Sequence, residues 1–310
     1  MQILPIQDVY ARRFARQSAI QELEYHASGH CVHIGKLSPG CQGCFVPSDF
    51  SYNIRTGPQC NVNCVYCPGT GRDKPGEYLD RIVAEMYTRA LVQDQGDTIP
   101  RVSFSGGGEP LMYLESIEEV MKPIQSIVAK GLMRKPWVHV YTNGLLADVD
   151  TVRKLKELGV DELRFHVGAS GFSRQVYANM KRAAGHVRVI TVETPAWPPH
   201  RSKLFEMLPI IEDMGVRHLN LGEVMLCKEN YRRISSILPD AEIYQHHELY
   251  LYDGGLVYDI IEEVLSRGFS YSVLDCSGFV KAMQRGPGKW VAHEDVTGLC
   301  ADYSDPQEPA

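Results

Sequence analysis

Short strand-like runs alternate with longer helix-like patterns through the middle of this 310-residue chain. Of all the sequence features, this alternation restricts the possible fold classes most. Each β-then-α unit is about 25–40 residues long, which favours parallel strands joined by helical crossovers. The strands are expected at Ser51–Arg55, Arg101–Ser105, Val138–Thr142, Glu162–Val167, Val187–Glu193 and His218–Val224. The residues alone leave two closures open, a barrel or partial barrel and an open doubly wound sheet.

The helices between these strands follow from apolar residues spaced three and four apart. They are expected at Glu77–Gln95, from Ile117 to Val128, after Asp148 or Asp150, near Ser173–Ala184, around Leu204–Ile211, and later at Leu256–Ser266. Asp148 and Asp150 are candidates for the residue that caps the third of these helices.

Three closely spaced cysteines, Cys60, Cys64 and Cys67, come directly after the first expected strand. Reactive groups in α/β barrels stand at the carboxyl ends of strands. Thiolates suit iron–sulfur clusters or zinc, and three of them leave one iron of a [4Fe–4S] cluster without a protein ligand. A zinc site and inert buried cysteines are the alternatives, although zinc prefers four ligands.

The Cys-x3-Cys-x2-Cys spacing, with the aromatic Tyr66 before the last cysteine, resembles the signature of the radical S-adenosylmethionine (SAM) superfamily. The resemblance covers roughly residues 51–225 and implies a (β/α)6 partial TIM-like barrel. It implies that SAM chelates the open iron and that Tyr66 lies near its adenine. It also implies that one electron from the cluster cleaves SAM to methionine and a 5′-deoxyadenosyl radical, which takes hydrogen from a substrate.

A glycine-rich run, Ser105–Pro110, follows the second expected strand. Glycines let a backbone approach a ligand closely, but such a run also makes a tight strand-to-helix turn. After the cysteine triple it resembles the superfamily's Gly-Gly-Glu-Pro motif, which implies that Gly107, Gly108 and Glu109 bind the amino group of SAM. The run resembles most closely that of proteins related to pyruvate formate-lyase-activating enzyme.

Polar residues near the ends of the later strands are further candidates, because inward polar groups in a barrel need a partner or a ligand. By resemblance, such positions contact the methionyl carboxylate and the ribose of SAM. A structural hydrogen bond is an equal alternative for each, and His166 also fits a core histidine. The candidates are Asn143, His166, Glu193 and Asn220.

A second cysteine set lies before the barrel: Cys31, Cys41 and Cys44, with a Cys-x2-Cys pair after Pro39-Gly40. This pair has the shape of a metal knuckle, and Cys276, Cys227 or Cys300 could add a fourth ligand. An auxiliary iron–sulfur cluster, a structural zinc site and free thiols all remain open.

Composition bears on the partners and the cellular compartment of the protein. The formal net charge of −6 gives no sign of bulk nucleic-acid binding. The chain has nine cysteines and no apolar leader among its first 17 residues, which suggests metal or redox roles for the cysteines in a reducing cytoplasm. No apolar stretch approaches 18 residues, so no membrane span is expected.

We expect an N-terminal extension at 1–50, the barrel at 51–225 and a C-terminal extension at 226–310 that completes or covers the barrel.

The resemblance predicts a radical SAM enzyme that needs an external one-electron donor of the flavodoxin or ferredoxin type. Its substrate would be a small molecule or a peptide. Activation of a glycyl-radical enzyme is an alternative, although the fourth strand reads Arg164-Phe165-His166-Val167-Gly168, without the Asp and Lys found there in that activating enzyme. A second alternative is a non-catalytic iron–sulfur or zinc protein that binds partners.

Overall fold

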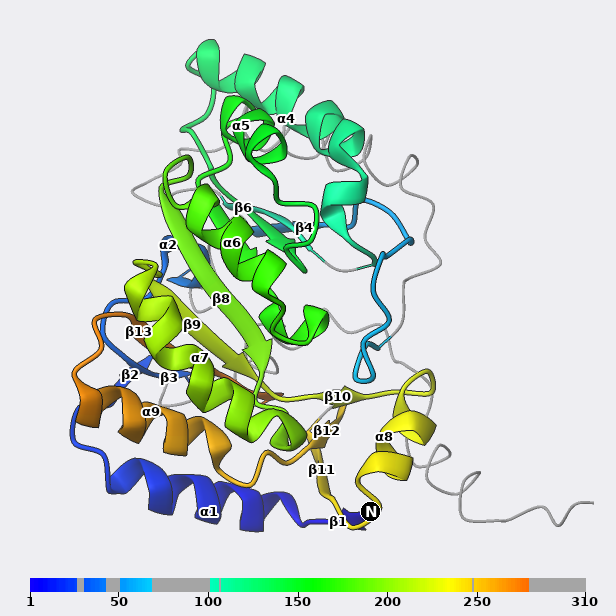
Figure 1. Ribbon diagram of the computed structural model, residues 1–310, viewed down its shortest axis with the longest axis vertical. Coiled ribbons are helices and arrows are strands. Elements are labelled where there is room, and N and C mark those ends of the chain that lie inside the picture. The colour runs from blue at the N-terminus through cyan, green and yellow to red at the C-terminus, as the bar shows by residue number, and fades with distance from the viewer. Residues whose placement is uncertain (27–30, 43–50, 69–100, 106, 247, 279–310) are drawn as a thin grey trace, which may run out of the picture.

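The computed structural model describes residues 1–26, 31–42, 51–68, 101–105, 107–246 and 248–278. These form a large curved sheet flanked by helices and a smaller sheet beside it (Figure 1). The helix expected at Glu77–Gln95, as well as Cys44 and Cys300, lies outside the described residues.

All six expected strands are present, and they pair in chain order as parallel neighbours. They are β4 (Ser51–Ile54), β5 (Arg101–Phe104), β6 (Trp137–Thr142), β7 (Glu162–Phe165), β8 (Val189–Pro195) and β9 (His218–Gly222). A further parallel strand, β13 (Ser272–Cys276), pairs with β9. The expected partial barrel is therefore confirmed, with β4 at one edge of the described sheet.

The N-terminal segment, where no element was predicted, extends this sheet. β3 (Cys31–Ile34) pairs antiparallel with β13, and β2 (Glu24–His26) pairs with β3 at the outer edge. The sheet order in the described residues is β2-β3-β13-β9-β8-β7-β6-β5-β4.

Helices cover the outer face of the barrel strands, where every second strand residue is apolar. Phe104, Val140, Leu163, Val192 and Leu219 are completely buried in one core with the inward faces of these helices. Alternation with a period of two places the intervening polar residues on the other face, in the barrel interior. The helices are α4 (Leu114–Ala129), α5 (Val149–Glu157), α6 (Arg174–Ala183), α7 (Arg201–Asp213) and α9 (Leu256–Arg267), with short η2 (Pro110–Met112), η3 (Val167–Ser170) and η4 (Pro198–His200) turns.

Local signals explain where helices begin. The Asp148 side chain accepts a 2.8 Å hydrogen bond from the backbone N–H of Thr151, so it caps α5 as one of the two expected candidates. Ser173 caps α6 in the same way through the N–H of Val176.

A smaller sheet joins the N-terminal strand to three strands from residues 225–251. Its order is β1 (Gln2–Ile3), β11 (Glu242–His246), β12 (Glu248–Leu251) and β10 (Met225–Leu226), with β1 parallel to β11. The short helix α8 (Tyr231–Ile237) lies between β10 and β11 in the chain and next to the cysteine loop in space (Figure 1).

The first helix, α1 (Ile6–Ser18), lies alongside α9 (Figure 1) and inserts one buried arginine into the protein. The Arg13 guanidinium forms ion pairs with Glu223 and with Asp275 (3.1 Å), and Asp253 lies 3.9 Å away. The Glu223 carboxylate also accepts a hydrogen bond from the Tyr244 hydroxyl. Because Glu223 and Asp275 belong to the ends of neighbouring strands, this buried network holds α1 against the barrel.

Within the described residues, none of the helices combines the length and the apolar character that crossing a bilayer requires.

Candidate active site at the cysteine loop

The cysteine loop, residues 55–68, leaves β4 at the carboxyl end of the parallel strands. Cys60 is exposed, whereas Cys64 and Cys67 are partly buried, and none of the three forms a disulfide. The backbone N–H of Cys67 bonds to the carbonyl of Cys64 at 3.1 Å, so a tight turn separates the last two thiols.

The three thiols are close enough to influence one another. The pKa of the Cys64 thiol is raised to about 12, mainly by burial and then by the charges of Cys67 and Cys60, while Arg233 opposes the increase. Among the described residues, no three Cys, His, Asp or Glu side chains converge as one metal ion requires. In a [4Fe–4S] cluster each thiolate binds a separate iron, so this loop suits a cluster better than a single zinc ion.

The glycine-rich run packs directly onto this loop. The backbone N–H of Glu109 donates a 2.9 Å hydrogen bond to the carbonyl of Gln59. A Cβ atom on Gly108 would lie only 2.3 Å from that carbonyl oxygen and 2.5 Å from the carbonyl of Gly57. Only glycine permits such an approach, and Gly107 beside it has a φ of +77°. The two predicted motifs therefore form one surface.

Glu109 points into the protein and connects this surface to β6. Its buried carboxylate accepts hydrogen bonds from the Thr142 hydroxyl (2.7 Å), the Asn143 N–H (2.7 Å) and the Leu111 N–H (3.1 Å). Burial raises the pKa of Glu109, and these hydrogen bonds oppose the increase. The carboxylate thus holds the loop, and the expected contact of Glu109 with the amino group of SAM stays a prediction.

Asn143 reaches the cysteine loop from the end of β6. Its amide Nδ2 lies 2.6 Å from Asn61 Oδ1 and 3.9 Å from the Cys60 sulfur. Of the softer predictions, Asn143 is therefore placed beside the predicted cluster ligands.

Aromatic rings pack around Tyr66 on the other side of the loop. Its ring stacks on His166 with 5.6 Å between centroids, and Trp197 and His200 meet it edge-on. Burial raises the pKa of the Tyr66 hydroxyl well above its ordinary value. His166 thus lies next to Tyr66, the aromatic residue of the cysteine motif.

The buried hydroxyls of Tyr66 and Thr194 both lie beside Gly168. Neither Tyr66 OH nor Thr194 Oγ1 has a hydrogen-bond partner in the part of the chain that the structure describes. Both face Gly168, where a Cβ atom would lie 2.6 Å from Thr194 Oγ1 and 2.8 Å from Tyr66 OH. Buried polar groups without partners are costly, so a polar ligand here would stabilise the site. This arrangement fits a nucleoside such as that of SAM.

Residues after position 225 support the cysteine loop, and no local sequence pattern marks them as part of the site. Asn230 Nδ2 donates to the Tyr66 carbonyl at 3.1 Å, and Arg233 bonds to Asn63 Oδ1 and to the Cys67 carbonyl, both at 3.2 Å. Tyr66 also shares an apolar cluster with Ile234. These contacts bring together residues about 165 positions apart in the chain.

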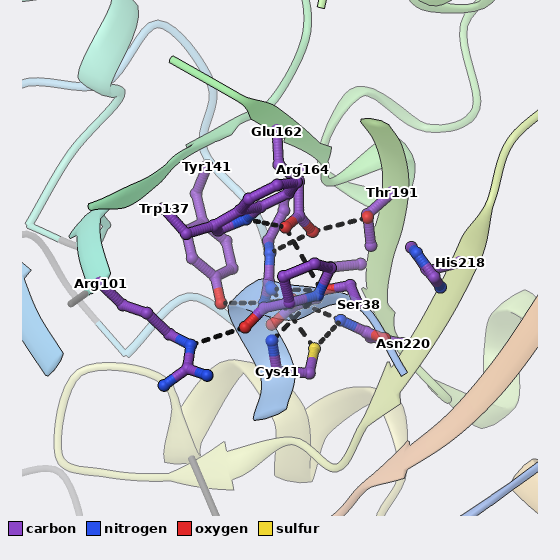
Figure 2. A network of polar contacts seen from close by, with 12 residues as sticks. Ser38, Cys41, Arg101, Trp137, Tyr141, Glu162, Arg164, Thr191, His218 and Asn220 are labelled. Carbon is purple, nitrogen blue, oxygen red and sulfur yellow. Dashed lines mark hydrogen bonds and ion pairs between the residues drawn. The ribbon is translucent and has the colours of Figure 1, made fainter. Parts of the chain in front are cut away.

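The interior of the barrel has a polar floor toward the amino ends of the strands (Figure 2). Arg164 lies at its centre and bonds to Glu162 (2.9 Å), Tyr141 (2.9 Å) and Ser38 (3.0 Å). The short helix α2 (Pro39–Gln42) closes this end, because the Pro39 carbonyl accepts a 2.6 Å hydrogen bond from Arg101, the first residue of β5.

Glu193 and Asn220, two of the predicted contacts of SAM, belong to this floor. Glu193 Oε2 accepts from Arg164 and from Asn220, each at 3.1 Å. The Glu193 side chain is 22% exposed, although Arg164 is almost fully buried. Glu193 is therefore the charged group of the floor that solvent or a ligand can reach.

The second cysteine set is only partly described. Cys41, in α2, is buried and lies 3.3 Å from both Arg164 Nη2 and Asn220 Nδ2, and burial raises the pKa of its thiol. Cys276 packs against the small apolar cluster that contains Cys41, and Cys31 lies in β3. Cys44 is outside the described residues, so the expected auxiliary site stays a prediction.

The protein is a partial barrel that carries a loop with three cysteines at the carboxyl ends of its strands. The family model of the Radical SAM superfamily matches residues 54–194. Over these residues, which are less than half of the chain, the protein is similar to this superfamily, whose members are enzymes that use a [4Fe–4S] cluster and SAM.

Two curated relatives come from Methanocaldococcus jannaschii. "Putative glycyl-radical enzyme activating enzyme MJ0021" is 24% identical over 226 residues, which cover 69% of this chain and 56% of the relative. "Uncharacterized protein MJ0804" is 28% identical over 156 residues, or 48% of this chain and 42% of the relative. The chain thus spans about half the length of the curated relatives it matches.

Among solved structures, Streptococcus suis SuiB bound to its precursor peptide SuiA matches with a TM-score of 0.50 and 12% identity. The match covers 75% of this chain and 50% of SuiB. At this identity the likeness shows a shared fold.

Proposed function

We propose that this protein is a radical SAM enzyme that takes hydrogen from a small-molecule or peptide substrate. Cys60, Cys64 and Cys67 would hold the [4Fe–4S] cluster. When bound, the cluster and SAM supply one-electron cleavage of the sulfonium C–S bond, which yields a 5′-deoxyadenosyl radical able to abstract hydrogen. The observation that carries the proposal is the direct packing of the glycine-rich run onto the cysteine loop through Gly108 and Glu109.

The protein's own residues would bind and orient SAM. The backbone of Gly107 and Gly108 would face its amino group, and the hydroxyls of Tyr66 and Thr194 would supply hydrogen bonds to its nucleoside. The rings of His166 and Trp197 around Tyr66 would exclude water from this part of the site. Precise holding matters because a misplaced radical would react with the protein itself.

We place the substrate in the barrel interior, above the polar floor. Glu193 is the partly exposed charged residue there, and Arg164 and Asn220 fix its position. Asn220 would assist by orienting this carboxylate toward SAM or the substrate.

The electron would come from an external one-electron donor of the flavodoxin or ferredoxin type. Cys60 is the exposed cysteine of the triple, so its side of the loop is the expected entry point. Because Cys60 is exposed, a cluster held there would be open to oxygen, so we propose a reducing, oxygen-poor compartment such as the cytoplasm of an anaerobe.

Activation of a glycyl-radical enzyme is the second candidate, supported by the name of the relative MJ0021. It predicts that the abstracted hydrogen comes from the α-carbon of glycine. A protein extract from cells grown on α-deuterated glycine would then transfer deuterium into 5′-deoxyadenosine, and an unlabelled extract would not. Product without deuterium would favour a different substrate.

The proposed activity can be tested without knowing the substrate. Anaerobically purified protein should contain about four irons and four sulfides in this cluster. With SAM and dithionite it should release 5′-deoxyadenosine and methionine. Cys64→Ala should lose both properties, whereas Cys227→Ala, which changes a cysteine that borders the same loop at Pro68, should keep them. A protein that binds only zinc and leaves SAM intact would instead be the non-catalytic binding protein.

A second metal site, with ligands among Cys31, Cys41, Cys44 and Cys276, would add iron or zinc beyond the first cluster. Metal analysis of Cys41→Ala and Cys276→Ala tests it. Unchanged metal content in both variants would assign Cys41 to the polar floor alone, where it already contacts Arg164 and Asn220.

A further inference from the structure

Arg233, on α8, grips the cysteine loop on both sides of Cys64. Its Nη1 donates to Asn63 Oδ1 and its Nη2 donates to the Cys67 carbonyl, both at 3.2 Å. Its third donor, Nε, is buried and has no hydrogen-bond partner within the described residues. A buried guanidinium donor without an acceptor is costly, so the site is incomplete without an acceptor nearby.

The support of Arg233 is rigid. The preceding Asn230 is fully buried and donates to the carbonyls of Tyr66 (3.1 Å) and Met225 (2.9 Å). The following Ile234 is fully buried in the apolar cluster that contains Tyr66. The backbone that carries Arg233 is therefore held in place by contacts that also hold Tyr66.

Arg233 also brings a positive charge to three thiols. Its guanidinium bonds to the carbonyl of Cys67, a predicted cluster ligand, and to Asn63, which directly precedes the predicted ligand Cys64. A cluster bound by three thiolates gains one more negative charge when it is reduced, so a nearby cation stabilises the reduced form more than the oxidised form.

We infer that Arg233 is a positioning residue for the cluster: it clamps the cysteine loop through Asn63 and Cys67, and its charge raises the reduction potential of the bound cluster. This inference rests on the proposed function. Charge-assisted hydrogen bonds from outer residues to metal ligands commonly tune both affinity and potential.

The test compares three variants of the full-length, cluster-loaded protein. Arg233→Gln removes the charge, Arg233→Lys keeps the charge without the two-pronged grip, and Arg232→Gln removes a charge from the exposed neighbouring position of the same helix. The measurements are iron and sulfide content, the rate of iron loss to a chelator, and the midpoint potential from an anaerobic titration followed by electron paramagnetic resonance. Circular dichroism verifies that each variant is folded.

We expect Arg233→Gln to lose iron about tenfold faster and to shift the midpoint potential to more negative values. Arg233→Lys should restore the potential but not the slow iron loss, and Arg232→Gln should match the wild type. A folded Arg233→Gln variant that retains no cluster would support the clamp.

Equal potentials and equal iron loss in Arg233→Gln and Arg232→Gln would overturn the inference. Faster iron loss with an unchanged potential would overturn the redox part, because a purely structural clamp has that effect. Failure of the wild type to hold an iron–sulfur cluster would instead reject the proposed function, so the two failures are distinguishable.

Discussion

The Glu109 carboxylate accepts a 2.7 Å hydrogen bond from the backbone N–H of Asn143, which links the glycine-rich run to the end of β6. Asn143 in turn bonds through its side chain to Asn61 in the cysteine loop. The glycine-rich run, the end of β6 and the cysteine loop therefore hold one another, although they are separate in the sequence. Glu109 forms the link between the first two of these segments.

Replacing Glu109 with Ala should destabilise the protein and weaken SAM binding. The change leaves the Thr142 hydroxyl and the N–H groups of Asn143 and Leu111 without their acceptor, at a cost of about 1–3 kcal/mol for each buried group that stays unpaired. Urea denaturation and SAM titration of the cluster-loaded protein measure the two effects. The exposed Glu119→Ala on α4 serves as the control, and a Glu109→Ala variant with normal stability would show that these bonds matter little.

Gly168→Ala should reduce SAM affinity while leaving the iron content intact. The added methyl group would enter the space between Thr194 Oγ1 and Tyr66 OH, where we place the nucleoside. Overpacking at this position should make the free energy of SAM binding less favourable by about 1–3 kcal/mol. Gly185→Ala is the matched control, because its Cβ would meet one backbone oxygen at 3.8 Å. SAM titration together with iron analysis checks the prediction, and equal affinity in the two variants would exclude this location.

Arg13→Met should destabilise the protein strongly, by about 3–5 kcal/mol, because it leaves buried carboxylates without their cation. The carboxylates are those of Glu223, Asp253 and Asp275. The exposed pair of Arg12 with Glu242 offers a control on the same helix, and Arg12→Met should change the free energy of unfolding little. Urea denaturation of both variants provides the comparison.

The Arg13→Met defect should also depend on pH. Burial raises the pKa of Glu223 to about 7 in the folded protein, and Arg13 opposes this increase. A carboxyl whose folded pKa is raised loses its stabilising contribution as the pH rises from its unfolded value through the folded one. Stability of the variant should therefore fall more steeply between pH 5 and 8 than that of the wild type. Parallel pH profiles would contradict this account of the network.

Acid should destabilise the polar floor through His139, a buried residue of β6 whose ring centroid lies 5.7 Å from that of Tyr141. Burial lowers the pKa of His139 to about 3, with Arg164 adding to the effect. A histidine whose folded pKa is lowered stabilises the protein above its unfolded pKa, and that contribution is lost as the pH falls toward the folded value. For His139 the loss should reach about 3 kcal/mol at pH 4.

The measurement is the free energy of unfolding between pH 7 and pH 4. His139→Gln should flatten this profile because no buried imidazole remains to be protonated, while the partly buried His186→Gln, beyond the end of α6, should keep the wild-type slope. An unchanged slope in His139→Gln would assign the acid sensitivity to other groups, of which His218 is the next candidate because burial lowers its pKa to about 4.

The amino-acid sequence by itself determined the six parallel strands, the cap at Asp148 and the two motifs that meet at the site. These features rest on short-range patterns: alternation along a strand, a capping oxygen three residues from its N–H, and cysteines within one loop. Each is complete within about ten residues, so a linear reading finds it.

Only the tertiary structure decided which distant residues complete the site. Arg13 meets Glu223 across 210 positions and Arg233 meets Asn63 across 170, and Glu109 turned its carboxylate toward Asn143 rather than outward. Nothing local distinguishes these residues from other arginines and glutamates, because their roles come from burial and from the partners that the fold brings to them. Buried charges need partners wherever the chain can supply them, and that requirement has no periodicity in the sequence.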